Sequence, residues 1–256
     1  MSDTMAQISI AKAMYDYTER WPDKEISHIS PSMLGGCLRK HYYAIIGIPK
    51  TTPPGPGAQL NFELGRMWEE VVEKALQNSS IPHLYQYKMH DAELNILGTL
   101  DFLLYDPGSK TWEVVDSKTE STLAGGYRKR ENNTFLSANK DYVYQVNTYA
   151  LTALRQGFDV RKARFVVINK DNGKIDEFPL NITKTSLEVT LRRIKRLNRY
   201  LHEDKLPPCE CKGWKVGYCN YGNPHSQKKN SSGKIVNTEC CSPSLLTEGR
   251  FGQDGR

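Results

Sequence analysis

Two aspartates in this sequence are placed to face each other across a β-hairpin. Residues 106–109, Asp-Pro-Gly-Ser, form a turn signal between two strand patterns at 96–105 and 112–118. In an ideal hairpin around that turn, paired residues have numbers that add up to 217, and Asp101 and Asp116 satisfy this condition. We therefore expect the two carboxylates on one face of the sheet, with Cβ atoms about 5 Å apart.

Two like charges among apolar neighbours require a compensating cation. The residues that flank the aspartates are Leu100, Phe102, Leu103, Val114 and Val115. A divalent metal ion is the simplest compensation, and oxygen ligands favour magnesium or manganese over zinc. Lys118 lies two residues after Asp116, so it projects from the same strand face. An ammonium beside a metal-bound water suits the hydrolysis of a phosphodiester. The alternative is an ordinary ion pair between Asp116 and Lys118 at a strand end.

The six cysteines predict a second metal centre. Three of them form a C-x-C-x7-C cluster late in the chain, and they are Cys209, Cys211 and Cys219. Clustered thiols in a reduced compartment favour a metal or iron–sulfur site over disulfides. Such a site typically takes four ligands, and the candidates for the fourth are Cys37, Cys240 and Cys241. Inert buried thiols are the alternative.

The elements that would position these residues alternate between helices and strands. Helical signals occur at 3–18, 30–46, 60–77, 141–156 and 186–202. Strand signals occur at 84–90, 96–105, 112–118 and 164–169. A linker rich in proline and glycine occupies 51–57, and we expect residues 222–256 to be irregular. This order predicts an α/β core with extensions at both ends.

The composition is that of a globular protein with a basic excess. Of the 256 residues, 38% are hydrophobic and 25% are charged, which excludes a wholly disordered or fibrous chain. The longest strongly apolar run has about ten residues, whereas a membrane span needs about 20. The N-terminus lacks the features of a secretory signal, so we expect an intracellular, cytoplasmic protein without a membrane partner.

Basic residues concentrate in the expected helix at 186–202. Between Thr190 and Tyr200 there is no acid, and the five bases are Arg192, Arg193, Lys195, Arg196 and Arg199. The chain also has 14 tyrosines against 7 phenylalanines. Basic side chains that contact phosphates, beside tyrosines that stack on bases, indicate a nucleic-acid partner. The alternative is a solvated helix face with scattered core tyrosines.

Four segments resemble the motifs of a known nuclease family. Residues 98–101, 113–119 and 145–149 resemble the G-x-x-D, (D/E)-x-K-T and Q-x-x-x-Y motifs of the RecB-like PD-(D/E)XK nucleases. Residues 30–39 resemble the S-x-S-x-L-x-x-C-x-R entry of the iron–sulfur branch, which contains CRISPR-associated RecB-like exonucleases, the AddB nuclease domain and phage exonucleases. The resemblance spans about residues 28–220.

This resemblance implies a PD-(D/E)XK α/β core with a mixed central sheet flanked by helices. It implies an N-terminal helical region at 1–57, a nuclease core at 58–206 and a cysteine-bearing tail at 207–256. The implied function is a metal-dependent DNA exonuclease that acts on single strands or ends in recombination, repair, replication or CRISPR adaptation. A catalytically silent nucleic-acid-binding or scaffold protein of the same fold is the alternative.

The resemblance also implies roles for individual residues. The ligands of Mg²⁺ or Mn²⁺ would be Glu69, Asp101, Asp116 and the carbonyl of Ser117. Glu69 stands four residues after Gly65, where the family often has histidine, and its alternative is a solvated helix acid. Lys118 would assist the attacking water, while Gln145 and Tyr149, on one helical face, would hold the site and the DNA strand or else be polar groups at the edge of the core.

The implied iron–sulfur ligands are Cys37, Cys209, Cys211 and Cys219. They would hold a structural [4Fe-4S] cluster, with zinc as the alternative. The family's late spacing is C-x2-C-x5-C, so Cys240 or Cys241 could replace one ligand here. The arginines expected to contact DNA are Arg39, Arg192, Arg193 and Arg196, and a surface ion pair is the alternative for Arg39.

Overall fold

A computed structural model gives the fold and describes residues 9–19, 25–121, 135–212, 214–217, 219–222, 226–229 and 235–238. The helices in these residues are α1 (Ile10–Glu19), α2 (Pro31–Leu34), α3 (Leu38–Ile45), α4 (Pro56–Ser79), α5 (Phe135–Ala138), α6 (Lys140–Arg155), α7 (Lys184–His202) and α8 (Trp214–Gly217). The strands are β1 (His83–Asp91), β2 (Ile96–Asp106), β3 (Thr111–Glu120), β4 (Val160–Asn169), β5 (Ile175–Asn181), β6 (Gln227–Lys229) and β7 (Ile235–Asn237).

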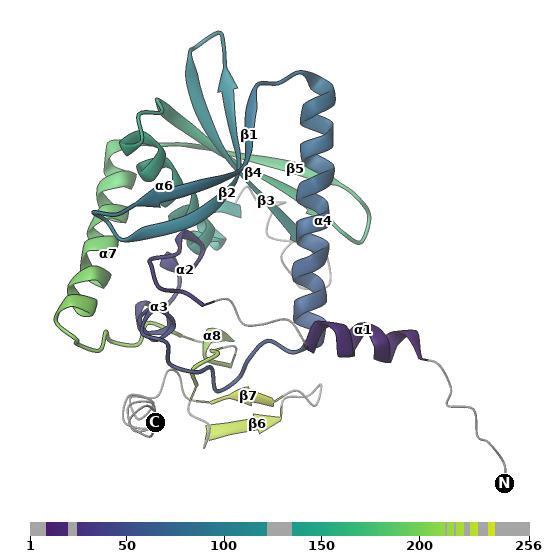
Figure 1. The fold of residues 1–256 in the computed structure, drawn as a ribbon, viewed down its shortest axis with the longest axis vertical. Coiled ribbons are helices and arrows are strands. Elements are labelled where there is room, and N and C mark those ends of the chain that lie inside the picture. Colours follow the sequence, from purple (N-terminus) through teal and green to yellow (C-terminus); the bar gives the residue numbers. More distant parts are fainter. Residues whose placement is uncertain are drawn as a thin grey trace, which may run out of the picture.

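Five strands form a mixed sheet in the order β1-β2-β3-β4-β5 (Figure 1). β1, β2 and β3 are antiparallel neighbours, β3 and β4 are parallel, and β5 is antiparallel to β4. A parallel pair needs a crossover, which the segment containing α6 provides between β3 and β4. The predicted fold class, an α/β fold with a mixed central sheet flanked by helices, is therefore confirmed.

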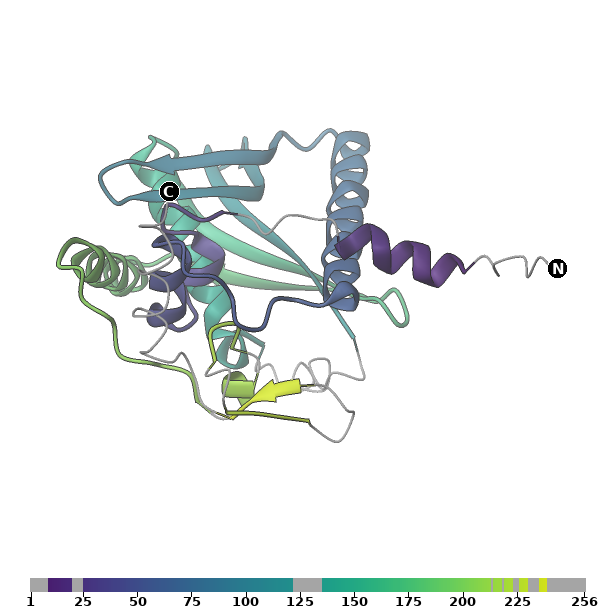
Figure 2. The same ribbon diagram turned by 60° about the horizontal axis from the view of Figure 1, so that its bottom comes forward.

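Helices lie on both sides of this sheet. α6 and α7 stand on one side and α4 stands on the other (Figure 1 and Figure 2). α6 contacts β1, β3 and β4 and closes an apolar core in which Leu103, Val114 and Val146 are fully buried. This core fixes the strand register, because a slip of one residue would turn the buried face to solvent.

A second apolar cluster joins the N-terminal part of the chain, α7 and the tail. Its buried members include Ile29, Leu34, Leu38, Tyr42, Tyr43, Ile194, Leu197, Cys219 and Tyr221. Burial of a large apolar side chain contributes about 1.5–3 kcal/mol, so these distant segments stabilise one another directly. The division into 1–57, 58–206 and 207–256 stays a prediction.

The helix expected at 30–46 is wrong as a single element. It is interrupted at residues 35–37, which separate α2 from α3. A Cβ on Gly35 would lie 2.3 Å from the Cα of Asp141, so only glycine allows α2 to approach the start of α6 this closely. A tertiary contact therefore sets the break.

The sequence patterns also miss β5. Its sequence, IDEFPLN, carries two acids and Pro179, which do not favour a strand. β5 is the edge strand next to β4. Proline has no backbone N–H to donate, and an edge strand tolerates it because no further strand pairs on its other side. In the region 222–256 the expected irregularity is wrong for the described part, which contains the short hairpin of β6 and β7.

Two helix boundaries differ from the expected ones. α4 begins at Pro56, inside the linker expected at 51–57, because proline suits the first helical turn. The helix expected at 3–18 is seen from Ile10, and residues 3–8 lie outside the described part of the chain. None of the described helices is long and apolar enough to cross a membrane.

Candidate active site

Asp101 and Asp116 meet where β2 and β3 cease to pair. The register is the predicted one, because the numbers of every β2–β3 pair add up to 217. The pairing ends at Phe102 and Val115, one residue before the two aspartates. There the Oδ2 of Asp101 accepts a hydrogen bond from the backbone N–H of Ser117 at 2.8 Å. A carboxylate of β2 thus contacts β3 where the backbone ladder stops.

Asp116 is fully buried and has two partners. Its Oδ1 accepts a hydrogen bond from Nε2 of Gln145 at 2.8 Å, and its Oδ2 lies 2.6 Å from Nζ of Lys118. The side chain of Lys118 is 19% exposed, so the ammonium reaches the edge of the site. The ion pair at this strand end is present, and it stands beside a second carboxyl group.

Burial governs the ionisation of these three groups. Burial and the neighbouring Asp116 raise the pKa of Asp101 to about 8. Burial also raises the pKa of Asp116, against the opposing effect of Lys118. Burial alone would lower the pKa of Lys118, but the two aspartates raise it, so its amine is charged at neutral pH. The site therefore has one ammonium for two carboxyl groups.

Glu69 reaches this pair from α4. Its Oε2 accepts a hydrogen bond from Nε2 of Gln86 in β1 at 2.7 Å. Burial raises the pKa of Glu69, Lys118 lowers it and Asp116 raises it again, so Glu69 interacts electrostatically with the site. Within the described part of the chain, the three carboxyl groups do not each place an oxygen so that all three oxygens lie within 4.8 Å of one another. Glu69 is thus a neighbour of the aspartates that is already bound to Gln86.

Two residues of α6 fix the strands that carry the aspartates. Gln145 binds Asp116 in β3, and one turn later the hydroxyl of Tyr149 donates to the carbonyl oxygen of Thr99 in β2 at 2.7 Å. Both side chains are buried. A Cβ on Gly98, next to Thr99, would lie 2.8 Å from Cδ of Pro31, so this glycine permits the close approach of β2 to α2 beside the Tyr149 ring. The motif residues of α6 therefore support both halves of the site.

Tyr142 completes this face of α6, and the sequence analysis does not identify it. Nζ of Lys118 lies 5.2 Å from the centre of its ring. The ring also packs near those of Phe135 and Phe165, with centroid distances of 6.3 and 6.1 Å. Its spacing of three residues before Gln145 is the signal that could have found it.

A second site gathers cysteines from both ends of the chain. The Sγ atoms of Cys37, Cys209 and Cys211 lie within 4.8 Å of one another. Cys219 lines a cavity of about 200 Å³ together with Cys37 and Cys211. None of the four forms a disulfide bond with another described cysteine. The structure therefore brings together the four cysteines named from the sequence, while residues 240–241 lie outside the described part.

Charged groups of both signs surround the thiols. Lys40, Lys215 and Asp141 line the cavity, and Nζ of Lys215 lies 2.6 Å from the carboxylate of Asp141. The backbone N–H of Glu210 donates to Sγ of Cys37 at 3.3 Å. This bond holds Cys37 beside the segment that carries Cys209 and Cys211.

Arg193, expected to contact DNA, has internal partners. Its guanidinium donates to the carbonyl oxygens of Leu34 and Gly36 and forms an ion pair with Glu210 at 2.6 Å. It also lies over the ring of Tyr144, 5.3 Å from the ring centre. These contacts join α2, α7 and the segment that carries Cys209 and Cys211. The sequence motifs predict neither this role of Arg193 nor the involvement of Glu210.

The other three arginines differ in their surroundings. Nε of Arg39 donates to the carbonyl oxygen of Pro207 at 2.7 Å, so it joins α3 to the tail. Arg196 lies 3.4 Å from Glu210, while Arg192 is exposed on α7. A role in DNA binding stays a prediction for all four arginines.

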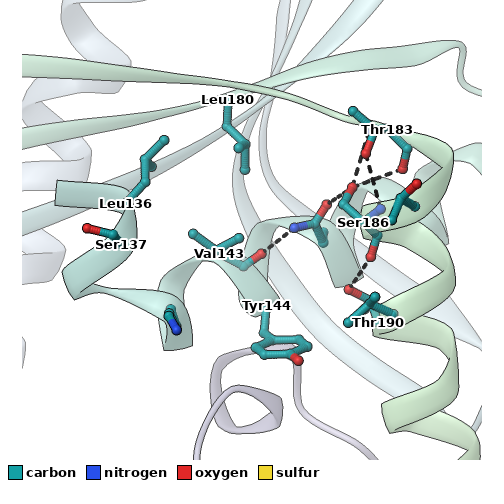
Figure 3. Close-up of a pocket in the computed structure, with 12 residues that line it drawn as sticks. Leu136, Ser137, Val143, Tyr144, Leu180, Thr183, Ser186 and Thr190 are labelled. Atoms are coloured by element: carbon teal, nitrogen blue, oxygen red, sulfur yellow. Dashed lines mark hydrogen bonds between the residues drawn. The ribbon is translucent and has the colours of Figure 1, made fainter. Parts of the chain in front are cut away.

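A cavity of about 500 Å³ lies between α5, α6, α7 and the end of β5 (Figure 3). Val143 and Asn147 line it, and by helical phase they lie on the opposite side of α6 from Gln145. Ser186 and Asn147, two polar residues that line the cavity, are hydrogen-bonded to each other: Oγ of Ser186 donates to Oδ1 of Asn147 at 2.8 Å. This cavity is separate from the aspartate site.

Comparisons with known proteins bear on the fold. No protein-family model matches the sequence, and no curated protein matches it. The crystal structure of SSO0001 is similar with a TM-score of 0.50 and 18% identity, over 82% of this chain and 93% of that chain. Two crystal structures of LHK-Exo, an alkaline exonuclease from Laribacter hongkongensis, are also similar, and each match covers 75% of this chain and 93% of that chain. The complex with dAMP has a TM-score of 0.47 and 8% identity, and the other structure has a TM-score of 0.45 and 7% identity. The similarity to SSO0001 shows a shared fold.

Proposed function

We propose that this protein is a metal-dependent DNA exonuclease that hydrolyses phosphodiester bonds in single strands or at DNA ends. The observation that carries the proposal is the meeting of Asp101 and Asp116 where β2 and β3 separate, with Nζ of Lys118 2.6 Å from Asp116. Paired carboxylates and an ammonium are the groups that metal-assisted phosphodiester hydrolysis needs. The resemblance to the RecB-like PD-(D/E)XK motifs supports the same reaction.

The residues of the site fit a divalent metal ion. Oδ2 of Asp116 is fully buried, and its partner among the described residues is the ammonium of Lys118 at 2.6 Å, which also interacts with Asp101. Burial, together with the neighbouring Asp116, raises the pKa of Asp101, so a further cation would stabilise the ionised form of this carboxyl group. Glu69, Asp101, Asp116 and the carbonyl of Ser117 would hold Mg²⁺ or Mn²⁺. Such an ion supplies Lewis acidity and a water of lowered pKa.

The surrounding side chains have separate tasks in this proposal. Lys118 remains protonated, so it acts through its charge, orienting the attacking water and stabilising the negative charge that develops on the phosphate. Gln145 fixes the orientation of Asp116, and Tyr149 fixes β2 beside Asp101. Groups that are held in place before the reaction need no rearrangement during it, which lowers the barrier.

We also infer that Cys37, Cys209, Cys211 and Cys219 hold a structural [4Fe-4S] cluster, with zinc as the alternative. Four cysteines that converge from both ends of the chain suit either centre. Zinc–sulfur bonds of about 2.3 Å place zinc-bound sulfurs about 4 Å apart, so the compact trio also fits one zinc ion. Iron content with a broad visible absorption supports the cluster, and a colourless protein that contains zinc supports the alternative.

DNA is the substrate in this proposal. Exposed bases of α7 suit phosphate contacts, and they are Arg192, Lys195 and Arg199. The corresponding setting is recombination, repair, replication or CRISPR adaptation in the cytoplasm of a bacterial, archaeal or phage-infected cell, together with proteins of those processes.

Digestion of end-labelled DNA tests the proposed function. Full-length protein, purified anaerobically, is incubated with single- and double-stranded DNA in Mg²⁺, Mn²⁺ or EDTA. We expect shortening that requires metal and disappears in Asp116→Asn. Asp159→Asn is the matched control, because Asp159 is exposed and pairs with Arg161 at 2.9 Å, away from the site. DNA binding without cleavage under any metal would instead support the silent nucleic-acid-binding protein.

A further inference from the structure

We propose that Tyr142 is a positioning residue that holds the ammonium of Lys118 at the reacting phosphate, an inference that rests on the proposed function. Nζ of Lys118 lies 5.2 Å from the centre of the Tyr142 ring. This distance is within the range of about 6 Å in which an aromatic face attracts a cation. The side chain of Lys118 is only 19% exposed, so water screens this attraction weakly.

Asp116 alone is a poor anchor for Lys118 during the reaction. The Oδ2 atom of Asp116 is both the neighbour of Nζ, at 2.6 Å, and a proposed oxygen ligand of a divalent cation. An oxygen that serves two cations holds each less tightly, because the cations repel each other. The ring of Tyr142 attracts an ammonium without offering a metal ligand. It can therefore keep Lys118 in place when Asp116 is engaged.

The ring of Tyr142 is itself held in place. It packs near Phe135 and Phe165, at centroid distances of 6.3 and 6.1 Å. Phe135 in turn stacks on Phe178 at 4.1 Å with an interplanar angle of 15°. A ring fixed in this way loses little freedom when it holds a lysine, which is the requirement for a supporting residue at a catalytic site.

The position of Tyr142 on α6 supports the same conclusion. Tyr142, Gln145 and Tyr149 follow an i, i+3, i+7 pattern, so they lie on one side of the helix. Gln145 fixes Asp116, Tyr149 fixes β2, and Tyr142 contacts Lys118. One face of α6 thus positions each element of the site, and the ring of Tyr142 is the part that contacts the lysine.

Steady-state kinetics on single-stranded DNA test this role. We expect Tyr142→Leu to lower kcat about tenfold with KM unchanged, because Lys118 acts on the transition state. Tyr142→Phe keeps the ring and should retain kcat within about twofold. The control Tyr144→Leu, on the other side of α6, should leave kcat unchanged. Equal losses in Tyr142→Leu and Tyr144→Leu would mean that any truncation on α6 lowers the rate through packing, which overturns the proposal.

NMR of ¹³C-lysine-labelled protein tests the contact without relying on activity. The ε-methylene signal of Lys118, assigned with Lys118→Arg, should lie upfield of the other lysines because of the ring current. The shift should vanish in Tyr142→Leu and persist in Tyr142→Phe and after addition of Mg²⁺. An absent shift, or one lost with Mg²⁺, overturns the proposal. A preserved shift in a protein that never cleaves DNA supports the contact and rejects the nuclease function.

Discussion

The aspartate site and the cysteine site draw on the chain in different ways. The aspartates come from two neighbouring strands joined by a short turn, and Lys118 follows Asp116 on the same strand. The cysteine site combines Cys37, which precedes α3, with Cys209 and Cys211, which follow α7. The first site depends on a local register, whereas the second exists only after distant parts of the chain have packed together.

The two sites also differ in how they compensate charge. Lys118 already neutralises part of the negative charge of the aspartate pair. The cysteine segment is held by an apolar cluster and by the ion pair of Arg193 with Glu210. We therefore expect metal at the aspartates to matter for activity, and metal at the cysteines to matter for stability.

The largest expected effect separates the two sites. Asp101→Asn should lower the rate of DNA hydrolysis at least about 10³-fold, because the metal loses an anionic ligand at the reacting centre. The metal content of the cysteine site should stay at the wild-type level, as measured by iron and zinc analysis. Loss of that metal together with activity would show that the sites are not independent.

A substitution in the cysteine site should change the stability of the protein more than its activity. Cys211→Ser should remove metal from the cysteine site and lower the free energy of unfolding by about 3 kcal/mol, or Tm by about 6–12 °C. The kcat of the folded protein should remain within about tenfold of the wild type. Cys240→Ser and Cys241→Ser are matched controls that should change neither quantity. A metal content that falls in a control and not in Cys211→Ser would reassign the ligand.

Arg193 tests whether the ion pair holds the cysteine segment. Arg193→Met should lower the free energy of unfolding by about 2 kcal/mol, because Glu210 and the carbonyls of Leu34 and Gly36 lose their donor. The exposed neighbour Arg192 is the control, and Arg192→Met should cost less than about 0.5 kcal/mol. Urea denaturation measures both. Weaker DNA binding in Arg193→Met without lost stability would favour a DNA contact instead.

The pH dependence of stability tests the protonation of Asp101. The pKa of Asp101 is raised to about 8, so the folded protein keeps a proton that the unfolded chain has released. The Tm of the metal-free protein should therefore fall as the pH rises from about 4 to about 8. Asp101→Asn should flatten this change, and identical profiles for the two proteins would contradict the assignment.

The sequence predicts the strand register at the two aspartates because this geometry is local. The turn at 106–109 sets the β2–β3 register, and the spacing of Gln145 and Tyr149 places both on one side of α6. Tyr142 was missed because a lone aromatic residue on a helix usually signals only core packing. Its contact with Lys118 depends on how α6 lies on the sheet.

The cysteine region is less predictable because tertiary contacts decide it. The spacing gives Cys209, Cys211 and Cys219 and leaves the fourth ligand open, and the ion pair of Arg193 with Glu210 carries no local signal. The break at residues 35–37 falls on Gly35 and Gly36, whose low helix propensity is a local signal, but the close approach of Gly35 to Asp141 is a tertiary contact that the sequence does not predict. The edge strand β5 was missed for a similar reason, since pairing with β4 overrides its unfavourable composition.

Binding of Mn²⁺ tests the central claim most directly. Electron paramagnetic resonance titration of the full-length protein should find a tight Mn²⁺ site in the wild type and in Cys211→Ser. The isosteric change Asp116→Asn should remove this site, because it replaces an anionic ligand by a neutral amide. Unchanged Mn²⁺ binding in Asp116→Asn would contradict the assignment of the aspartates as the metal site.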